Sequence, residues 1–290
     1  MAIYHLNLAP IRRHEGGSAV AHVAYMTATR ARDERTGDVS DYSRKSGVLD
    51  SGVVGWNGDA ASLAQSAEFA ETRGKAVVGR RVIIALPHEL PLAEQRAAVE
   101  QFAQQLHARH GCGVAFALHA PDAHGDERNA HAHVFLTARR VGPDGSSLGE
   151  KTRELDRIDT GSDALHSMRS DWEKLVNDAL ARQGHRYTVD RRSHAAKAAA
   201  EGLPAVEPLE HLGPARSAVE RRGGSTRAGR RNAARVAFRA RVAPYFAAAR
   251  QAAADLVKAA KSEAAIFARA AELRAERRRE NSQQRGPRMR

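Results

Sequence analysis

Short segments of the chain alternate hydrophobic with polar residues, or collect β-branched residues, and such segments predict β-strands. Turn residues separate them, and Pro87 ends one of them because proline has no backbone N–H to give to a sheet. The expected strands cover residues 2–9, 80–87, 113–119 and 132–140.

Longer segments repeat their hydrophobic positions at helical spacing. Ser18 is a plausible N-cap for the first helix, and Gly111 follows the clearest helix at the position where a left-handed residue is expected. The expected helices cover residues 19–35, 61–73, 92–110, 163–184 and 236–280, the last one interrupted near Pro244. A polar segment containing Gly37, Gly47 and Gly52 separates the first two helices, and residues 281–290 are expected to be frayed or disordered.

This order of strands and helices predicts an α+β fold in which helices cover one face of a sheet. The composition then changes, because the chain beyond residue 190 is rich in Ala, Arg and Glu. Residues 1–215 carry 26 basic and 28 acidic side chains, whereas residues 216–290 carry 20 and 6. We therefore expect a folded domain over 1–215 and a basic helical extension over 216–290 with a different task.

The remaining composition limits the chemistry and the location of the protein. The net charge of +12 suggests a polyanionic partner. A single cysteine, Cys112, excludes an internal disulfide and a multi-cysteine zinc site, so any metal must be held by His, Asp or Glu. The sequence shows neither a signal peptide nor an apolar run of about 18 residues, so we expect a cytosolic protein without membrane insertion.

Two histidines two residues apart, His131 and His133, lie in the expected strand over 132–140 and its preceding turn. Side chains of a strand alternate between its faces, so both imidazoles point the same way. His119 ends the preceding strand, and pairing of the two strands brings it close to them. Three neutral imidazoles can hold a divalent metal ion, although ordinary strand histidines facing solvent are the alternative.

Tyr25 lies in the first expected helix. A tyrosine of this kind is usually a packing residue, but a phenolate next to a metal ion is suited to attack a phosphodiester. Two other classes fit parts of the pattern. A metal-dependent hydrolase of small molecules would use the histidines without Tyr25, and a non-catalytic DNA-binding protein would depend on the basic extension.

Several runs, taken together, resemble the MobA/MobL, or MobQ-type, mobilisation relaxases. These are "SAVAHVAY", "DERTGDVSDYSRKSGV", "IALPHELPLAEQ", "LHAPDAHGDERNAHAHVFLTAR" and "HLGP", in the same order, over roughly residues 1–215. The resemblance implies an HUH-type endonuclease fold in the permuted order, with the tyrosine before the histidines. An HUH enzyme of replication or transposition shares the chemistry, but this order and these segments argue against it.

The resemblance also implies the parts of the site. It gives Tyr25 as the nucleophile, and His119, His131 and His133 as ligands of Mg²⁺ or Mn²⁺. The implied activity is nicking of one DNA strand at a plasmid transfer origin through a 5′-phosphotyrosyl intermediate, followed by rejoining. The implied partners are single-stranded origin DNA, relaxosome accessory proteins and a type IV secretion coupling protein, and the protein itself can pass to the recipient cell.

One position departs from the family pattern. Ile83 stands where many relatives carry a glutamate before "ALP", so a relaxase that only binds DNA is an alternative. Asp126 and Glu127 are candidate substitutes, and the general base is left unassigned. Candidate phosphate contacts are Arg12, Arg13, Arg44, Lys45, Arg139 and Arg140. The basic extension is expected to bind DNA or a partner protein.

Overall fold

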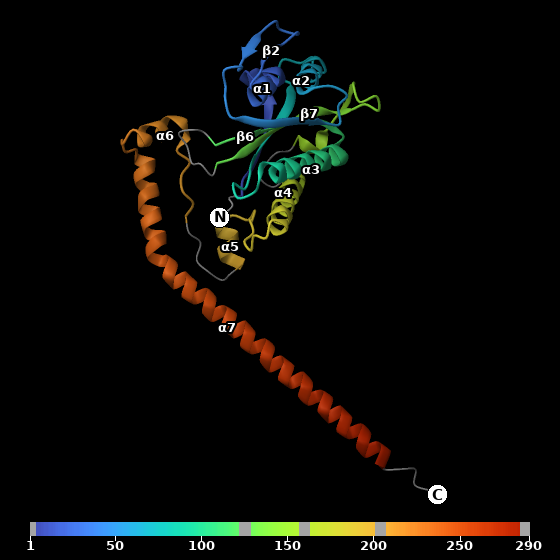
Figure 1. Ribbon diagram of the computed structural model, residues 1–290, viewed down its shortest axis with the longest axis vertical. Helices are drawn as coiled ribbons and strands as arrows, with labels where there is room; N and C mark the ends of the chain where they lie inside the picture. Colours follow the sequence, from blue (N-terminus) through green and yellow to red (C-terminus); the bar gives the residue numbers. More distant parts are fainter. Residues whose placement is uncertain (1–3, 122–128, 157–162, 201–206, 285–290) are drawn as a thin grey trace. The chain divides into compact units, whose positions relative to one another are not determined.

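The main sheet is antiparallel and links strands that are distant in the sequence. The computed structural model describes residues 4–121, 129–156, 163–200 and 207–284 (Figure 1). The strand order is β1-β5-β7-β6-β4, and β8 pairs with the end of β7. The strands are β1 (Leu6–Arg12), β4 (Val48–Val54), β5 (Val77–Ala85), β6 (Cys112–His119), β7 (His131–Val141) and β8 (Leu148–Lys151). Strands β2 (Arg30–Arg32) and β3 (Val39–Asp41) form a separate antiparallel pair.

Helices cover both faces of this sheet (Figure 1). The helices are α1 (Ala19–Thr27), α2 (Ala60–Phe69), α3 (Leu92–His110) and α4 (Asp163–Arg182), with short 3₁₀ turns η1 (Arg13–Glu15) and η2 (Arg153–Leu155). Phe102 of α3 and Trp172 of α4 pack together against one face, with ring centroids 5.4 Å apart. Val23 of α1 and Leu63 of α2 pack with Phe135 on the other face. The expectation of helices on one face only is therefore wrong, whereas the α+β class is confirmed.

Alternation along β7 decides which residues meet which helices. Ala132, Val134 and Leu136 belong to the core under α3 and α4, whereas Phe135 belongs to the core under α1 and α2. Since side chains alternate along a strand, His131 and His133 share the face of Phe135. The two histidines therefore face the helix that carries Tyr25.

Strand β4 is the main element that the sequence did not predict. It forms an edge of the sheet by pairing with β6, and it lies in the segment expected to be a polar connection. Gly52 occurs where β4 crosses Phe116, and a Cβ atom at this position would lie 2.5 Å from the Phe116 ring. Gly52 weakens the strand pattern in the sequence, but the close approach of the Phe116 ring leaves no room for a larger residue there.

Helix α1 is shorter than expected. It ends at Thr27 because Ala28 adopts a left-handed conformation, with φ of 54°, and donates its N–H to the Ala24 carbonyl. The expected continuation to residue 35 is wrong, since β2 begins at Arg30. The other predicted helices and strands of the first part of the chain are present with small shifts of their ends.

The chain divides into two units, Met1–Arg191 and Arg192–Arg290. The second unit contains α5 (His194–Ala200), α6 (Gly213–Arg221) and α7 (Arg227–Gln284). The expected break at Pro244 is wrong, because α7 continues through it. The carbonyl of Ala240, which proline deprives of its partner, belongs to an exposed residue that water can reach. The functional boundary at residue 215 stays a prediction, and residues 285–290 lie outside the described part.

Within the described ranges, none of the helices combines the length and the apolar character that crossing a membrane requires.

Candidate active site

The turn before α1 fixes where the helix starts. Gly16 has a φ of 78°, and a Cβ atom at Gly17 would lie 2.7 Å from the Arg12 carbonyl oxygen. Ser18 then acts as the N-cap, as predicted, because its hydroxyl accepts the N–H of Ala21 at 3.2 Å.

A buried carboxylate anchors the same end of α1. Glu68 of α2 is fully buried and accepts the N–H of Ala19 at 2.6 Å through Oε1. Its other oxygen accepts from the Arg13 guanidinium at 2.8 Å. Arg13 also donates to the backbone carbonyls of Glu68, Glu71 and Arg73. Negative charge at a helix N-terminus is favourable, so this pair stabilises the helix that carries Tyr25.

Three histidines converge on the face of the sheet that packs against α1. His119 of β6 lies directly across from His131 of β7, and His133 lies two residues further along β7. The ring centroids of the three pairs are 4.6 to 5.3 Å apart. One ring nitrogen of each histidine lies within 4.8 Å of the others. Strand pairing thus brings together the three histidines that the sequence proposed.

Hydrogen bonds fix which nitrogens are free. His119 Nε2 donates to the Met26 carbonyl at 2.7 Å, so its lone pair is on Nδ1 in the neutral ring. His131 Nδ1 donates to the Asn129 carbonyl at 3.0 Å, which leaves the lone pair on Nε2. His133 Nδ1 is buried and has no hydrogen-bond partner among the described residues. Backbone carbonyls that orient imidazoles in this way are a regular feature of metal sites.

Burial keeps two of these rings neutral. Burial, together with the charges of Lys45 and His131, lowers the pKa of His119 to about 4, against the hydrogen bond to Met26, which raises it. Burial also lowers the pKa of His133 to about 3, with further contributions from His119 and His131. Neutral imidazoles have the lone pairs that a metal ion needs, so the donor set fits a divalent ion.

Tyr25 lies beside the three histidines. Its ring packs edge-on against His133, with centroids 5.8 Å apart, and against Tyr42, with centroids 5.3 Å apart. The side chain is 39% exposed, and its hydroxyl has no hydrogen-bond partner in the described part of the chain. A phenol that is held by its ring while its oxygen is free can be approached by a substrate.

Lys45 joins the tyrosine to the histidines. Its ammonium lies 3.6 Å above the centroid of the Tyr25 ring and 3.3 Å from His119 Nδ1, and it donates to the Tyr25 carbonyl at 3.2 Å. Burial lowers the pKa of Lys45. The ammonium therefore lies between the phenol ring and the free nitrogen of His119.

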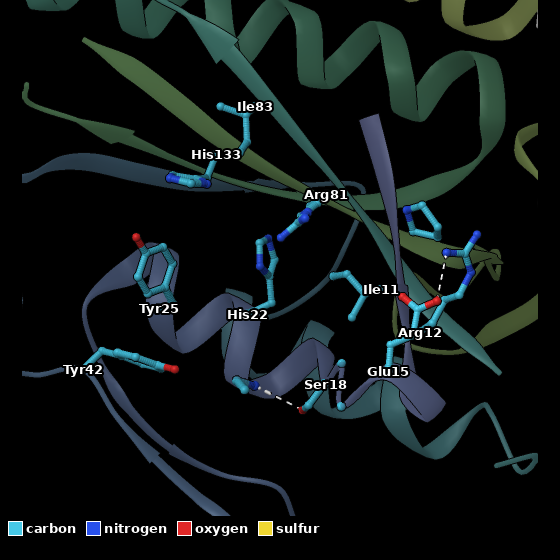
Figure 2. A pocket seen from close by; sticks show the side chains of 14 residues that line it. Ile11, Arg12, Glu15, Ser18, His22, Tyr25, Tyr42, Arg81, Ile83 and His133 are labelled. Carbon is cyan, nitrogen blue, oxygen red and sulfur yellow. Dashed lines mark hydrogen bonds and ion pairs between the residues drawn. The ribbon is translucent and has the colours of Figure 1, made fainter. Parts of the chain in front are cut away.

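A pocket of about 550 Å³ opens from Tyr25 and His133 along the first helix (Figure 2). Figure 2 shows His22 and Arg81 side by side in its middle, and the Tyr25 hydroxyl on the side of His133. Burial, together with the charges of Arg81 and Lys45, lowers the pKa of His22 to about 4. The pocket is lined by Pro10, Ile11, Arg12, Glu15, Gly16, Gly17, Ser18, Ala21, His22, Tyr25, Tyr42, Arg81, Ile83 and His133.

The six predicted phosphate contacts fall into different surroundings. Lys45 is in the site, and Arg12 lines the pocket while paired with Glu15 at 3.3 Å. Arg13 is held by Glu68, whereas Arg44 is exposed.

Arg139 and Arg140 lie at the other end of β7 from its histidines. Arg139 pairs with Glu71 at 2.8 Å and Arg140 with Glu154 at 2.8 Å. Their DNA contacts, like those of the other four basic residues, stay predictions.

Sequence reasoning did not select His22, Tyr42 or Arg81. Two signals were available: His22 lies three residues before Tyr25, on the same helix face, and Arg81 lies two residues before Ile83, on the same strand face. Ile83 is directly opposite His133 in the sheet, so the position that carries a glutamate in the family pattern does border the site. Asp126 and Glu127 lie outside the described residues.

Fold and site together define a class: an α+β protein whose antiparallel sheet presents three histidines, suited to a metal ion, to a tyrosine on a covering helix. Comparison with known families places the chain more closely. Residues 17–222 match the model of the MobA/MobL family. The chain belongs to the MobA/MobL family, as the sequence resemblance implied.

Individual relatives agree with this placement. The mobilization protein MobL of Acidithiobacillus ferridurans is 38% identical over an alignment of 252 residues, and the match covers 77% of this chain and 65% of that protein. A probable mobilization protein MobA of Bifidobacterium longum is 28% identical over an alignment of 270 residues, and the match covers 77% of this chain and 45% of the relative. The chain therefore spans about half to two thirds of the length of these two relatives.

A solved structure from work on the molecular basis of vancomycin resistance transfer in Staphylococcus aureus has the same architecture. It superposes with a TM-score of 0.56 and 25% sequence identity. The match covers 66% of this chain and 100% of the other. The two proteins therefore share the antiparallel α+β fold.

Proposed function

We propose that this chain nicks one strand of DNA at a plasmid transfer origin and later rejoins it, as a mobilisation relaxase. One observation carries the proposal: in a MobA/MobL member, the Tyr25 ring lies 5.8 Å from His133, within a cluster of three histidines whose nitrogens lie within 4.8 Å of one another. The nicking domain is proposed to cover residues 1–215.

The proposed reaction is a transesterification with Tyr25 as the nucleophile. The phenol oxygen attacks the scissile phosphorus, the bond from phosphorus to the 3′ oxygen breaks, and that oxygen leaves as a 3′-hydroxyl after taking up a proton. The phenol proton is released, and the DNA 5′ end stays bound to Tyr25 as a phosphodiester. One phosphodiester replaces another, so attack by a 3′-hydroxyl reverses the step and rejoins the strand without ATP.

His119, His131 and His133 would hold a divalent metal ion, proposed as Mg²⁺ or Mn²⁺. When bound, such an ion neutralises phosphate oxygens and stabilises the charge that develops in the transition state. The Lys45 ammonium lies 3.6 Å above the centroid of the Tyr25 ring and helps to hold the ring in place through a cation–π contact. The edge-on contacts with His133 and Tyr42 keep the ring oriented.

The basic extension is proposed to add affinity for DNA or for a partner protein. Helix α7 exposes many arginine side chains and several hydrophobic ones. Contacts of arginine with phosphates release counterions, so any DNA affinity from this region falls with salt and is independent of sequence. Relaxosome accessory proteins and a secretion coupling protein are the proposed protein partners.

A covalent-adduct assay tests the function. The full chain is incubated with Mn²⁺ and single-stranded oligonucleotides, labelled on the 3′ side of each candidate nick, from a panel of transfer origins. We expect a labelled protein band on denaturing gels, lost with EDTA and lost in Tyr25→Phe. Tyr42→Phe is the matched control, because Tyr42 is in ring contact with Tyr25 and is the nearest competing phenol.

The outcomes separate the alternatives. If the band survives in Tyr25→Phe and is lost in Tyr42→Phe, the nucleophile is misassigned. If DNA binds but no adduct forms with any origin, the chain is a relaxase-like DNA-binding protein, and Ile83 opposite His133 is the first position to restore to glutamate. Nicking without an adduct would instead indicate a metal-dependent hydrolase.

A further inference from the structure

The pocket beside Tyr25 contains a basic side chain, Arg81, that pairs with no acidic side chain of the described residues. Among the described residues that line the pocket, Glu15 supplies the carboxylate. It pairs with Arg12 at 3.3 Å and with His14 at 3.7 Å. Arg81 is exposed and has neither a hydrogen bond nor an ion pair with the described residues. A free guanidinium that lines a concave site favours an anionic ligand.

The register of the sheet gives the position of Arg81 relative to the reaction centre. On β5, Ile83 lies opposite His133 and Arg81 lies opposite Phe135. Arg81 and Ile83 share one face of the strand and are about 7 Å apart along it. This spacing is comparable to one nucleotide step of an extended single strand, and Figure 2 shows Arg81 between His133 and the turn before α1.

Shape and chemistry agree with a phosphodiester as the ligand. A guanidinium offers a planar fork of N–H donors that matches two phosphate oxygens. Other residues of the lining are neutral or apolar, among them Ile11, Ala21 and His22, and Glu15 is already paired with Arg12. The pocket volume of about 550 Å³ lies within the range of small-molecule sites and holds a nucleotide unit.

We propose that Arg81 binds the phosphodiester next to the scissile phosphate and so positions the DNA strand for attack by Tyr25. The proposal rests on the proposed function, because it names the part of the substrate that the pocket takes. Contacts with phosphates fix the register of a strand without reading its bases. Arg81 is accordingly a positioning residue of the substrate site, and the base sequence is read elsewhere.

The first test needs no cleavage. Binding of an oligo-deoxythymidine probe to the full chain is followed by fluorescence anisotropy over a range of salt concentrations, for wild type, Arg81→Gln and Arg153→Gln. Arg153 is the matched control, since it is an exposed arginine outside this pocket and has no ion pair among the described residues. Loss of one phosphate contact makes the negative slope of log K against log salt shallower by about 0.7. We expect this change for Arg81→Gln and an unchanged slope for Arg153→Gln.

The second test locates the phosphate. A series of origin oligonucleotides is used, each with a single neutral methylphosphonate at a different position around the mapped nick. The rate of adduct formation is measured at subsaturating DNA. When the phosphate next to the nick is modified, we expect adduct formation by wild type to fall about tenfold. Arg81→Gln should reduce adduct formation on unmodified DNA by about tenfold as well, and combining the variant with the modified DNA should reduce it no further. At the other positions the two effects should multiply.

The results distinguish this proposal from the function on which it rests. Equal salt slopes for Arg81→Gln and wild type, or effects that multiply at every position, would overturn the role of Arg81. An absence of adduct in wild type would overturn the proposed function. In that case the salt slopes would still decide whether Arg81 contacts a phosphate.

Discussion

Glu68 is the side chain whose replacement tests how the fold holds Tyr25. Glu68→Gln keeps the shape of the side chain but removes its charge and one of its two acceptor oxygens. The Ala19 N–H or the Arg13 guanidinium then loses its hydrogen-bond partner. The Arg13 side chain, which is 13% exposed, also loses the negative charge that lies 2.8 Å from it. Breaking one side of a buried ion pair costs about 3 to 5 kcal/mol.

The lower end of this range applies to Glu68, because Arg13 keeps its hydrogen bonds to three backbone carbonyls. We therefore expect Glu68→Gln to reduce the free energy of unfolding by about 3 kcal/mol. Glu15→Gln is the control, since Glu15 is 57% exposed and forms a surface pair with Arg12. Pairs of this kind contribute about 0 to 1 kcal/mol.

Urea unfolding followed by tryptophan fluorescence measures the difference. Both tryptophans, Trp56 and Trp172, lie in the first unit, so the signal reports the unit that contains Glu68. The change in midpoint multiplied by the m-value gives the lost free energy. If Glu68→Gln loses no more stability than Glu15→Gln, the buried carboxylate is not the anchor of α1.

Two further predictions concern charge near the histidines. Replacing Lys45 by Met should tighten Mn²⁺ binding about tenfold in calorimetry, since its ammonium lies 3.3 Å from His119 Nδ1 and repels a dication there; weaker binding would contradict this. The pKa of His22 is lowered to about 4, so the unfolded chain takes up the proton first, and stability present above about pH 6.5 is lost as the pH falls towards 4. Urea midpoints should therefore fall less steeply with acid in His22→Gln, and parallel curves would refute this cause.

The sequence predicted the site where the chemistry depends on local periodicity. His131 and His133 share a face because every strand alternates, and His119 joins them because the two strands are neighbours in sequence and pair in space. Ser18 and Gly111 were likewise predicted from local rules for helix ends, and both have the predicted role.

Long-range contacts escaped prediction. Lys45 lies 20 residues from Tyr25 and 74 from His119, and no local pattern indicates that its ammonium contacts both. Arg13 is tied to Glu68, 55 residues away, so the sequence shows a basic residue but not the carboxylate that holds it. Strand β4 was missed for a related reason, since Gly52 is required by the ring of Phe116 on the neighbouring strand.

The central claim is that Tyr25 becomes covalently bound to DNA, and peptide mapping of the adduct tests it most directly. After reaction with an origin oligonucleotide and Mn²⁺, nuclease and trypsin digestion leave the peptide of residues 14–30, which contains Tyr25 as its tyrosine. The account predicts a nucleotide remnant on Tyr25 of this peptide in the mass spectrum. A remnant on another residue, or a nicked strand with a free 5′-phosphate and no modified peptide, would contradict it.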